Sequence, residues 1–376
     1  MEETFHNIEW ERIEAAGIRE EMLCTIRNLS SDDKDVRKQT LMDLFDRIWY
    51  QGTLSWSSAF AASFLIERLQ QEQEPELLER ILLNLVHLGT GSAYCDPHND
   101  LSIYQDRLNT TGFQTKRDQE LEGVNATYQV VYKGVNLYLD LLENDSPNVR
   151  IAAAYTLTCC QPDADKICNR MYMWFRSEVD ESVKVHLLLC LAILSNSTFV
   201  DPTFFQEVLN SPESDLVKLS AAVSLADVAG KNISSEAVKI LVYLLNKPNL
   251  FRTLYTDYQS PMSTAHCLSI IDFLHRLNEQ QKAKIIPVLI KVWGLPFFID
   301  DLMYLAFGNK KITVGSTVYD LTPTQRIFLQ AIADDNNTWN QTDNLVRKIL
   351  NDLGIKGSPL RDKLIRFLNG ERLKYE

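Results

Sequence analysis

Apolar and basic residues recur along the chain with a period of 34 residues. An apolar residue followed by a cation stands at four positions, each 34 residues after the last: Val149-Arg150, Val183-Lys184, Val217-Lys218 and Phe251-Arg252. Other apolar residues stand eight positions before the first member of each pair, at Leu141, Phe175, Leu209 and Tyr243, and four positions after it, at Ala153, Leu187, Ala221 and Tyr255. Positions three or four apart share one face of an α-helix. The period therefore predicts two consecutive helices per unit, with these columns facing inward.

A turn rich in small, polar and helix-breaking residues separates the two helices of each unit. The turns are Asn144–Pro147, Asp180–Ser182 and Ser211–Asp215. Asp and Ser side chains can accept hydrogen bonds from the first N–H groups of the next helix. A single helix pair has one apolar stripe per helix and cannot bury it alone, so neighbouring pairs are expected to stack into a solenoid.

More copies of the helix pair lie outside the strict period. The turn and the dipeptide recur in Asp33-Lys34-Asp35-Val36-Arg37, a second pair is expected at 59–69 and 77–88, and an irregular last pair at 285–293 and 297–307. The sequence therefore predicts an all-α chain with about seven helix pairs.

The unit that begins at Val149 resembles a known repeat. Its sequence Val149-Arg150-Ile151-Ala152-Ala153-Ala154-Tyr155-Thr156-Leu157, preceded by an Asp-containing turn, resembles the HEAT repeat of armadillo-type α-solenoids. The resemblance covers roughly residues 20 to 307. Tyr50–Thr53 and Leu321–Arg326 extend it to a group of uncharacterised bacterial HEAT-repeat domain-containing proteins. It implies a scaffold and no particular activity.

Residues 89–125 interrupt the predicted array. They contain Gly89, Gly91, Pro97, Gly112 and Gly123 among many polar residues, and they are too numerous for an ordinary connection between helices. Long insertions in repeat proteins project from one face and often bind, although a surface loop packed by its own side chains would have the same composition.

The pattern changes again after residue 308. Residues 311–314 and 316–319 alternate apolar with polar around Gly315, which is typical of a β-hairpin, and helical patterns follow at 322–334, 342–353 and 358–369. We therefore expect a HEAT-like solenoid over residues 1–308 and a C-terminal capping module, a small hairpin plus helices, over residues 309–376.

Charge is distributed unevenly along the chain. The 376 residues carry a net charge of −12, whereas residues 309–376 contain 11 basic and 8 acidic residues. The acidic excess therefore belongs to the predicted array. It repels the phosphate backbone and argues against nucleic acid as a partner.

Other features of the sequence indicate a cytoplasmic protein without a membrane partner. The longest apolar run, Leu187–Leu194, is far shorter than the roughly 18 residues of a membrane span, and the chain opens with Met1-Glu2-Glu3 instead of a basic and apolar leader. Seven cysteines spread over a large chain are expected to be reduced thiols, mostly in the core.

Enzyme signatures are missing from the sequence. It contains no glycine-rich phosphate loop, no His-Glu-x-x-His, no Cys-x-x-Cys and no Gly-x-Ser-x-Gly. The insertion holds the nearest approach to a metal or nucleophile constellation, at Cys95, Asp96, His98 and Asp100. No second closely spaced Cys/His pair completes a zinc site. We therefore expect neither a metal nor a cofactor, and treat these four residues only as insertion-loop candidates.

The basic column has two interpretations. Its members are Arg37, Arg150, Lys184, Lys218 and Arg252. In HEAT-like repeats the helix that begins with this residue lies on the concave side, so the column could grip an acidic partner or a phosphate. In the interpretation we favour, each cation pairs with a carboxylate of an adjacent turn, such as Asp33, Asp145, Asp180 or Asp215, and forms a ladder between repeats.

Two functions from different classes are consistent with these observations. The first is a non-enzymatic protein-binding scaffold that docks a basic protein partner; in its most specific version it is an immunity protein that neutralises a basic bacterial toxin or nuclease. The second is an enzyme on a HEAT-like scaffold, similar to the alkylpurine DNA glycosylases or to bilin lyases. The acidic array opposes DNA binding, so we favour the scaffold.

Overall fold

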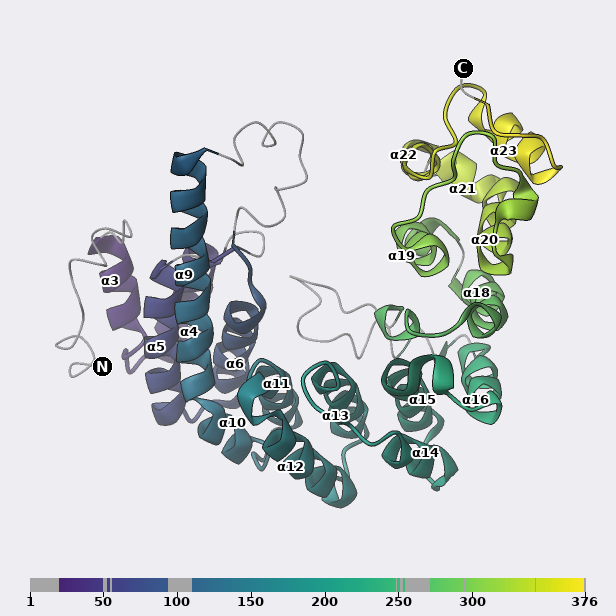
Figure 1. Cartoon of the computed structure of the whole chain (residues 1–376). Helices are drawn as coiled ribbons and strands as arrows, with labels where there is room; N and C mark the ends of the chain where they lie inside the picture. The colour runs from purple at the N-terminus through teal and green to yellow at the C-terminus, as the bar shows by residue number, and fades with distance from the viewer. Residues whose placement is uncertain are drawn as a thin grey trace. The chain divides into compact units, whose positions relative to one another are not determined.

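The computed structural model describes residues 20–49, 53–54, 56–93, 110–247, 249–250, 253, 271–293, 295–341 and 343–374 (Figure 1). Within these ranges the regular structure is helical and contains no strand, although Thr53 and Ser92 form one isolated parallel bridge. The predicted all-α class is confirmed. In the same ranges no helix is both long and apolar enough to cross a membrane.

The described residues divide into two compact units, one up to Phe199 and one from Val200 onward. The helices of unit 1 are α3 (Glu20–Asn28), α4 (Lys34–Ile48), α5 (Trp56–Gln71), α6 (Pro75–Thr90), α9 (Thr111–Lys133), α10 (Val135–Leu141), α11 (Pro147–Thr158), the 3-10 turn η1 (Gln161–Asp163), α12 (Ala164–Ser177) and α13 (Glu181–Leu194). The second helices of successive pairs pack on one another, α4 on α6, α6 on α11 and α11 on α13. Each first helix packs beside its own second helix, as α5 does on α6 and α12 on α13.

The predicted turns cap the helices that follow them. The carboxylate of Asp33 accepts the N–H of Asp35 at the start of α4, and the carboxylate of Asp180 accepts the N–H groups of Ser182 and Val183 at the start of α13. These bonds satisfy backbone donors that have no partner within the helix. The polar residues between the apolar stripes thus define where the second helices begin.

The inward columns are buried where the structure describes them, except at Leu141, which is half-buried, and at Tyr243. Val149, Val183 and Val217 and the residues four positions later are at most 1% exposed. Tyr243, in contrast, is 63% exposed, so its predicted inward position is wrong. The ring lies beneath the ammonium group of Lys247, 4.7 Å from its centroid, and it gains this contact at the surface. Phe251 and Tyr255 lie outside the described residues.

The second helices are buried on more than one stripe. Every residue of α11 from Val149 to Thr158 is buried, and α13 is buried nearly throughout. Both helices are apolar around most of their circumference, and such helices lie inside a protein. The expectation of one apolar stripe per helix is therefore wrong for α11 and α13.

The insertion predicted at 89–125 is shorter than expected. Helix α6 continues through Thr90, and α9 begins at Thr111, so the last fifteen residues of the predicted insertion form helix. Helix α9 packs against α5 and α6 and buries Val124 and Val131 there. Gly123 is buried within α9, where packing outweighs its low helix propensity, whereas Gly112 lies in the exposed first turn.

Unit 2 begins with a helix pair and ends in a cluster of short helices. Its elements are α14 (Pro202–Asn210), α15 (Asp215–Ala229), η2 (Gly230–Asn232), α16 (Ser235–Leu245), η5 (Asp272–Leu274), α18 (Glu279–Trp293), α19 (Leu295–Phe307), η6 (Val318–Asp320), α20 (Pro323–Asp334), α21 (Asn336–Gln341), α22 (Asp343–Asp352) and α23 (Leu360–Leu368). Helices α18, α19 and α23 surround α20. The three helices predicted after residue 321 are confirmed, whereas α21 had not been predicted.

The β-hairpin predicted at 311–319 does not form. Its backbone groups bond instead to segments that are distant in sequence: Ile312 donates to the carbonyl of Leu353, Gly315 donates to the carbonyl of Leu373, and Leu373 donates to the carbonyl of Ser316. Gly315 has a φ of 89°, which only glycine adopts readily. Two four-residue arms offer too few cross-strand bonds to compete with these longer-range ones.

Candidate functional site

Arg150 of the basic column lies in a buried ion pair. Its Nε and Nη2 donate to the two carboxylate oxygens of Glu178 at 2.9 and 3.1 Å, and its Nη1 donates to the carbonyls of Asn144 and Asp145 at 2.8 and 3.1 Å. The two side chains are only 10% and 3% exposed. This guanidinium therefore uses its donors between two turns of the chain and leaves little for a ligand.

Glu178 is held in place by further donors. Its Oε1 accepts the N–H groups of Val179 and Asp180 at 2.9 Å, and its Oε2 accepts the indole N–H of Trp174 at 3.2 Å. A buried carboxylate needs such a full set of donors to offset the loss of water. The pair therefore forms a closed polar network between the second helix of one pair and the turn of the next pair.

Arg37, on α4, makes the same arrangement with Glu72 in the turn before α6. Its Nε and Nη2 donate to Glu72 at 3.0 and 3.3 Å, and its Nη1 donates to the carbonyls of Ser31 and Asp32. Burial favours a raised pKa for Glu72, but the N–H of Glu74 and the guanidinium groups of Arg37 and Arg68 outweigh it and hold the pKa below its usual value. The two networks differ mainly in the donor four residues before the Glu, Arg68 in one and Trp174 in the other.

Each arginine pairs with a carboxylate of an adjacent turn, as predicted, but with a Glu instead of the aspartates given as examples. From its own turn it takes only backbone carbonyls, and the Glu comes from the next turn. The signal for this Glu is its position two residues before the N-cap residue, as Glu72 stands before Glu74 and Glu178 before Asp180. Sequence reasoning missed it because the pairs span 35 and 28 residues.

The remaining sequence candidates are less closely defined. The ammonium group of Lys184 lies 5.5 Å from the ring centroid of Phe175, and the side chains of Lys184 and Lys218 are half-buried. Arg252 and the insertion-loop candidates Cys95, Asp96, His98 and Asp100 lie outside the described residues. Among the column members that the structure describes, Arg37 and Arg150 lie in the buried ion pairs given above.

The ladder places the turns of unit 1 next to one another. Besides the two arginine networks, Lys34 pairs with Glu74 at 3.2 Å, and the amide of Asn148 donates to Glu79 at 3.2 Å. We call the segments 31–35, 72–76, 144–148 and 178–181 the turn edge. Its exposed carboxylates are Asp32, Asp33, Asp35, Glu76, Asp145 and Glu181.

Nearly all of the acidic excess of the chain lies in the sequence of unit 1. Residues 1–199 contain 31 acidic and 18 basic residues, whereas residues 200–376 contain 19 and 20. The carboxylates named above face solvent, as does Lys34 of the same edge, whereas Arg37 and Arg150, on the helices that follow, are buried. The turn edge therefore carries six exposed carboxylates on turns that the ion pairs hold next to one another.

The buried titratable groups of unit 1 are arranged for packing. The hydroxyl of Tyr155 lies 2.9 Å from Nδ1 of His186, and burial lowers the pKa of His186 to about 4. Burial also raises the pKa of Cys159 and of Cys168 to about 12. A thiol is nucleophilic as the thiolate, so these two are inert near neutral pH.

Metal ligands do not gather in the part of the chain that is described. There, no group of three or more His, Cys, Asp or Glu side chains is placed to hold a metal ion. The five described cysteines form no disulfide with one another: Cys24, Cys159, Cys160, Cys168 and Cys190.

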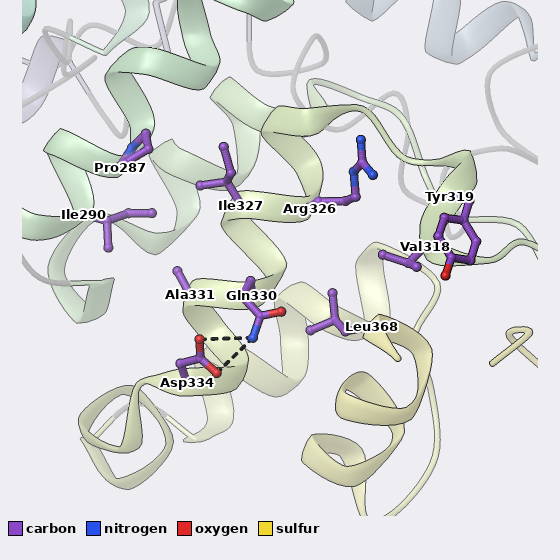
Figure 2. Close-up of a pocket in the computed structure, with 10 residues that line it drawn as sticks. All are labelled: Pro287, Ile290, Val318, Tyr319, Arg326, Ile327, Gln330, Ala331, Asp334 and Leu368. Atoms are coloured by element: carbon purple, nitrogen blue, oxygen red, sulfur yellow. Dashed lines mark hydrogen bonds between the residues drawn. The ribbon is translucent and has the colours of Figure 1, made fainter. Parts of the chain in front are cut away.

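Unit 2 contains an open groove of about 640 Å³ over helix α20. Figure 2 shows Ile327 and Ala331 of α20 between two walls, with Pro287 and Ile290 of α18 on one side and residues of η6 and α23 on the other. The second wall consists of Val318 and Tyr319 of η6 and Leu368 of α23. The polar residues of α20 that line the groove are Arg326, Gln330 and Asp334. Sequence reasoning missed this groove because its walls come from three separate segments.

Comparisons with known proteins assign no family to this chain. No protein-family model matches it, and neither does any curated protein. Among solved structures, it has a likeness to an engineered protein determined by crystallography, at 14% identity, over 93% of this chain and 88% of that one, with a TM-score of 0.29. A likeness this distant carries no conclusion about fold or function.

Proposed function

We propose that the protein is a non-enzymatic, cytoplasmic scaffold that docks a basic protein partner on the turn edge of unit 1. The observation that carries this proposal is the alignment of exposed carboxylates by the buried ladder, in the unit that holds the acidic excess of the chain. A rigid row of like charges attracts an oppositely charged surface over long range and speeds its encounter. It also makes the docking specific to partners whose cations match the row.

The role of the basic column follows from the same geometry. In this proposal Arg37 and Arg150 fix the spacing of the turns and do not touch the partner, because their donors are occupied within unit 1. A fixed spacing means that little ordering is needed when a partner binds, which favours affinity.

We further propose that the helix pairs continue as a HEAT-like solenoid of about seven pairs, closed at its C-terminal end by the helices after residue 308. The stacking of α4, α6, α11 and α13 in sequence order supports this. In the most specific version, the partner is a bacterial toxin or nuclease, and docking covers the cationic surface with which it would bind phosphates. The acidic charge of unit 1 supports that version.

The proposal predicts that neutralising the turn edge abolishes capture of a basic partner. The variant is Asp32→Asn, Asp145→Asn and Glu181→Gln, which removes three exposed charges and keeps the capping side chains Asp33 and Asp180. Wild type and variant serve as bait in a lysate of the native host at low and moderate salt. We expect wild type to retain a stoichiometric basic protein, and the variant to lose it.

A matched control separates the turn edge from net charge. Asp46→Asn, Asp118→Asn and Glu122→Gln remove the same number and types of exposed charges from α4 and α9, away from the turn edge. This control should retain the partner. Equal loss of the partner from both variants, or an acidic partner, would contradict docking on the turn edge.

A further inference from the structure

We propose that the groove over α20 in unit 2 is a second binding site, whose occupant is an acidic amphipathic helix of a partner protein. This inference does not depend on the docking of a basic protein by unit 1. It rests on three features of the groove: an apolar floor between two walls, exposed apolar and aromatic side chains along it, and a rim that carries more cations than anions.

The floor of the groove has the shape of a helix-binding surface. Ile327 and Ala331 are four residues apart on α20 and form an apolar strip, and Arg326, Gln330 and Asp334 form a polar strip beside it. From Arg326 to Asp334 the helix rises about 12 Å, which matches about two turns of an occupant. An amphipathic helix laid in an apolar groove makes its main contacts at positions i, i+3 or i+4 and i+7.

The walls offer side chains suited to such an occupant. Tyr319 is 78% exposed on one side of the groove, and Pro287 is exposed on the other. Tyrosine and arginine are enriched among residues that dominate binding energy, because they combine a large apolar surface with a polar group. Burying the exposed ring of Tyr319 and the side chain of Ile327 beneath leucine or phenylalanine side chains would supply the apolar contribution.

The rim favours an acidic occupant. Lys284 and Lys291 are exposed on α18, three residues before and four residues after Pro287, and therefore lie on the same ridge of the helix. Arg326 adds a third cation on α20. Of the anions, Asp334 accepts two hydrogen bonds from Gln330 at 3.0 Å, and Asp320 accepts the N–H of Thr317 at 2.7 Å. The cations therefore outnumber the carboxylates at the rim, and the latter already have partners.

The test uses a synthetic helical peptide of about 14 residues, or four turns, with leucines at i, i+4 and i+7 and glutamates on the flanks. A second peptide has lysine in place of each glutamate. Binding of both to the full chain is followed by fluorescence anisotropy at low salt. We expect the acidic peptide to bind roughly tenfold or more tightly than the basic peptide, because the cationic rim attracts one and repels the other.

Three variants locate the binding. Lys291→Glu with Arg326→Glu should weaken the acidic peptide by roughly tenfold or more and reverse the preference between the peptides. Ala331→Arg should abolish binding, because the new side chain fills the floor. Lys348→Glu with Lys356→Glu reverses two exposed cations of unit 2 that lie on neither α18 nor α20, and it should leave the affinity unchanged. Circular dichroism confirms that each variant is folded.

Several results would overturn this assignment. Equal affinity for both peptides, or no loss of binding in Ala331→Arg, would show that the groove does not select an acidic helix. Light scattering supplies a further check, since dimerisation of wild type that Ala331→Arg abolishes would identify a second copy of the chain as the occupant. If the turn-edge variant of unit 1 lost binding of the acidic peptide while the groove variants kept it, the assignment of the peptide to the groove would also be contradicted.

Discussion

Replacing Glu178 with alanine should lower the local stability of unit 1 by about 3 to 5 kcal/mol. The substitution leaves the guanidinium of Arg150 buried without its carboxylate and also removes the acceptor of the N–H groups of Val179 and Asp180. An uncompensated buried charge costs far more than a surface pair contributes. The measurement is amide hydrogen exchange in α11 and α13, which reports the free energy of local opening.

Two further variants make this result specific to the buried network. Glu76→Ala removes the partner of the exposed Lys38 and should leave exchange in α4 and α6 unchanged. Arg150→Met combined with Glu178→Leu removes both charges and should recover much of the loss, because neither charge is then left buried alone. If Glu178→Ala has no more effect than Glu76→Ala, the ladder does not hold the turns together.

Acidification should destabilise unit 1 through His186 by about 3 kcal/mol between pH 6.5 and pH 4. Burial lowers the folded pKa of His186 to about 4 from a usual value near 6.5, and the described partner of its ring is the hydroxyl of Tyr155. In this window the unfolded chain binds a proton that the folded chain does not, so lowering the pH favours unfolding. Below about pH 4 both states are protonated and the effect is complete.

The check is a series of urea denaturations from pH 7 to pH 4 on wild type and on His186→Gln. Glutamine keeps a hydrogen-bonding side chain near Tyr155 and does not titrate. We expect the variant to be less stable at pH 7, because a core ring is replaced, and the difference between the two proteins to shrink as the pH falls. If the stabilities of the two proteins changed with pH in parallel, His186 would have the same pKa in the folded and unfolded states, and the prediction would be wrong.

The parts of the fold that local chemistry determines could be predicted from the sequence. The burial of Val149 and Val183 followed from the 34-residue period, because the same interior position recurs in each helix pair. The starts of α4 and α13 followed from Asp33 and Asp180, because a cap acts within three residues of its own position. The cap lies within a few residues of the helix start that it predicts, and the buried position is repeated once in each helix pair.

The remaining features depend on contacts between distant segments. Glu72 and Glu178 pair with arginines of the preceding helix pair, and the repeat spacing showed the arginines but not these partners. The segment around Gly315 alternates like a hairpin, yet it bonds to the C-terminal segment at Leu373. The groove over α20 was missed for the same reason, since no local pattern reveals which segments meet.

Association of the captured basic partner with the chain at a series of salt concentrations tests the central claim most directly. Charges further apart than about 8 to 10 Å are screened at 0.1 to 0.15 M salt, so steering by the turn edge should weaken as salt rises. Docking on the turn edge predicts that the association rate falls roughly tenfold or more from low to high salt, while the dissociation rate changes little. In the variant with Asp32→Asn, Asp145→Asn and Glu181→Gln, the rate should be lower and its salt dependence shallower. An association rate that is independent of salt, or an equally steep dependence in this variant, would contradict the account.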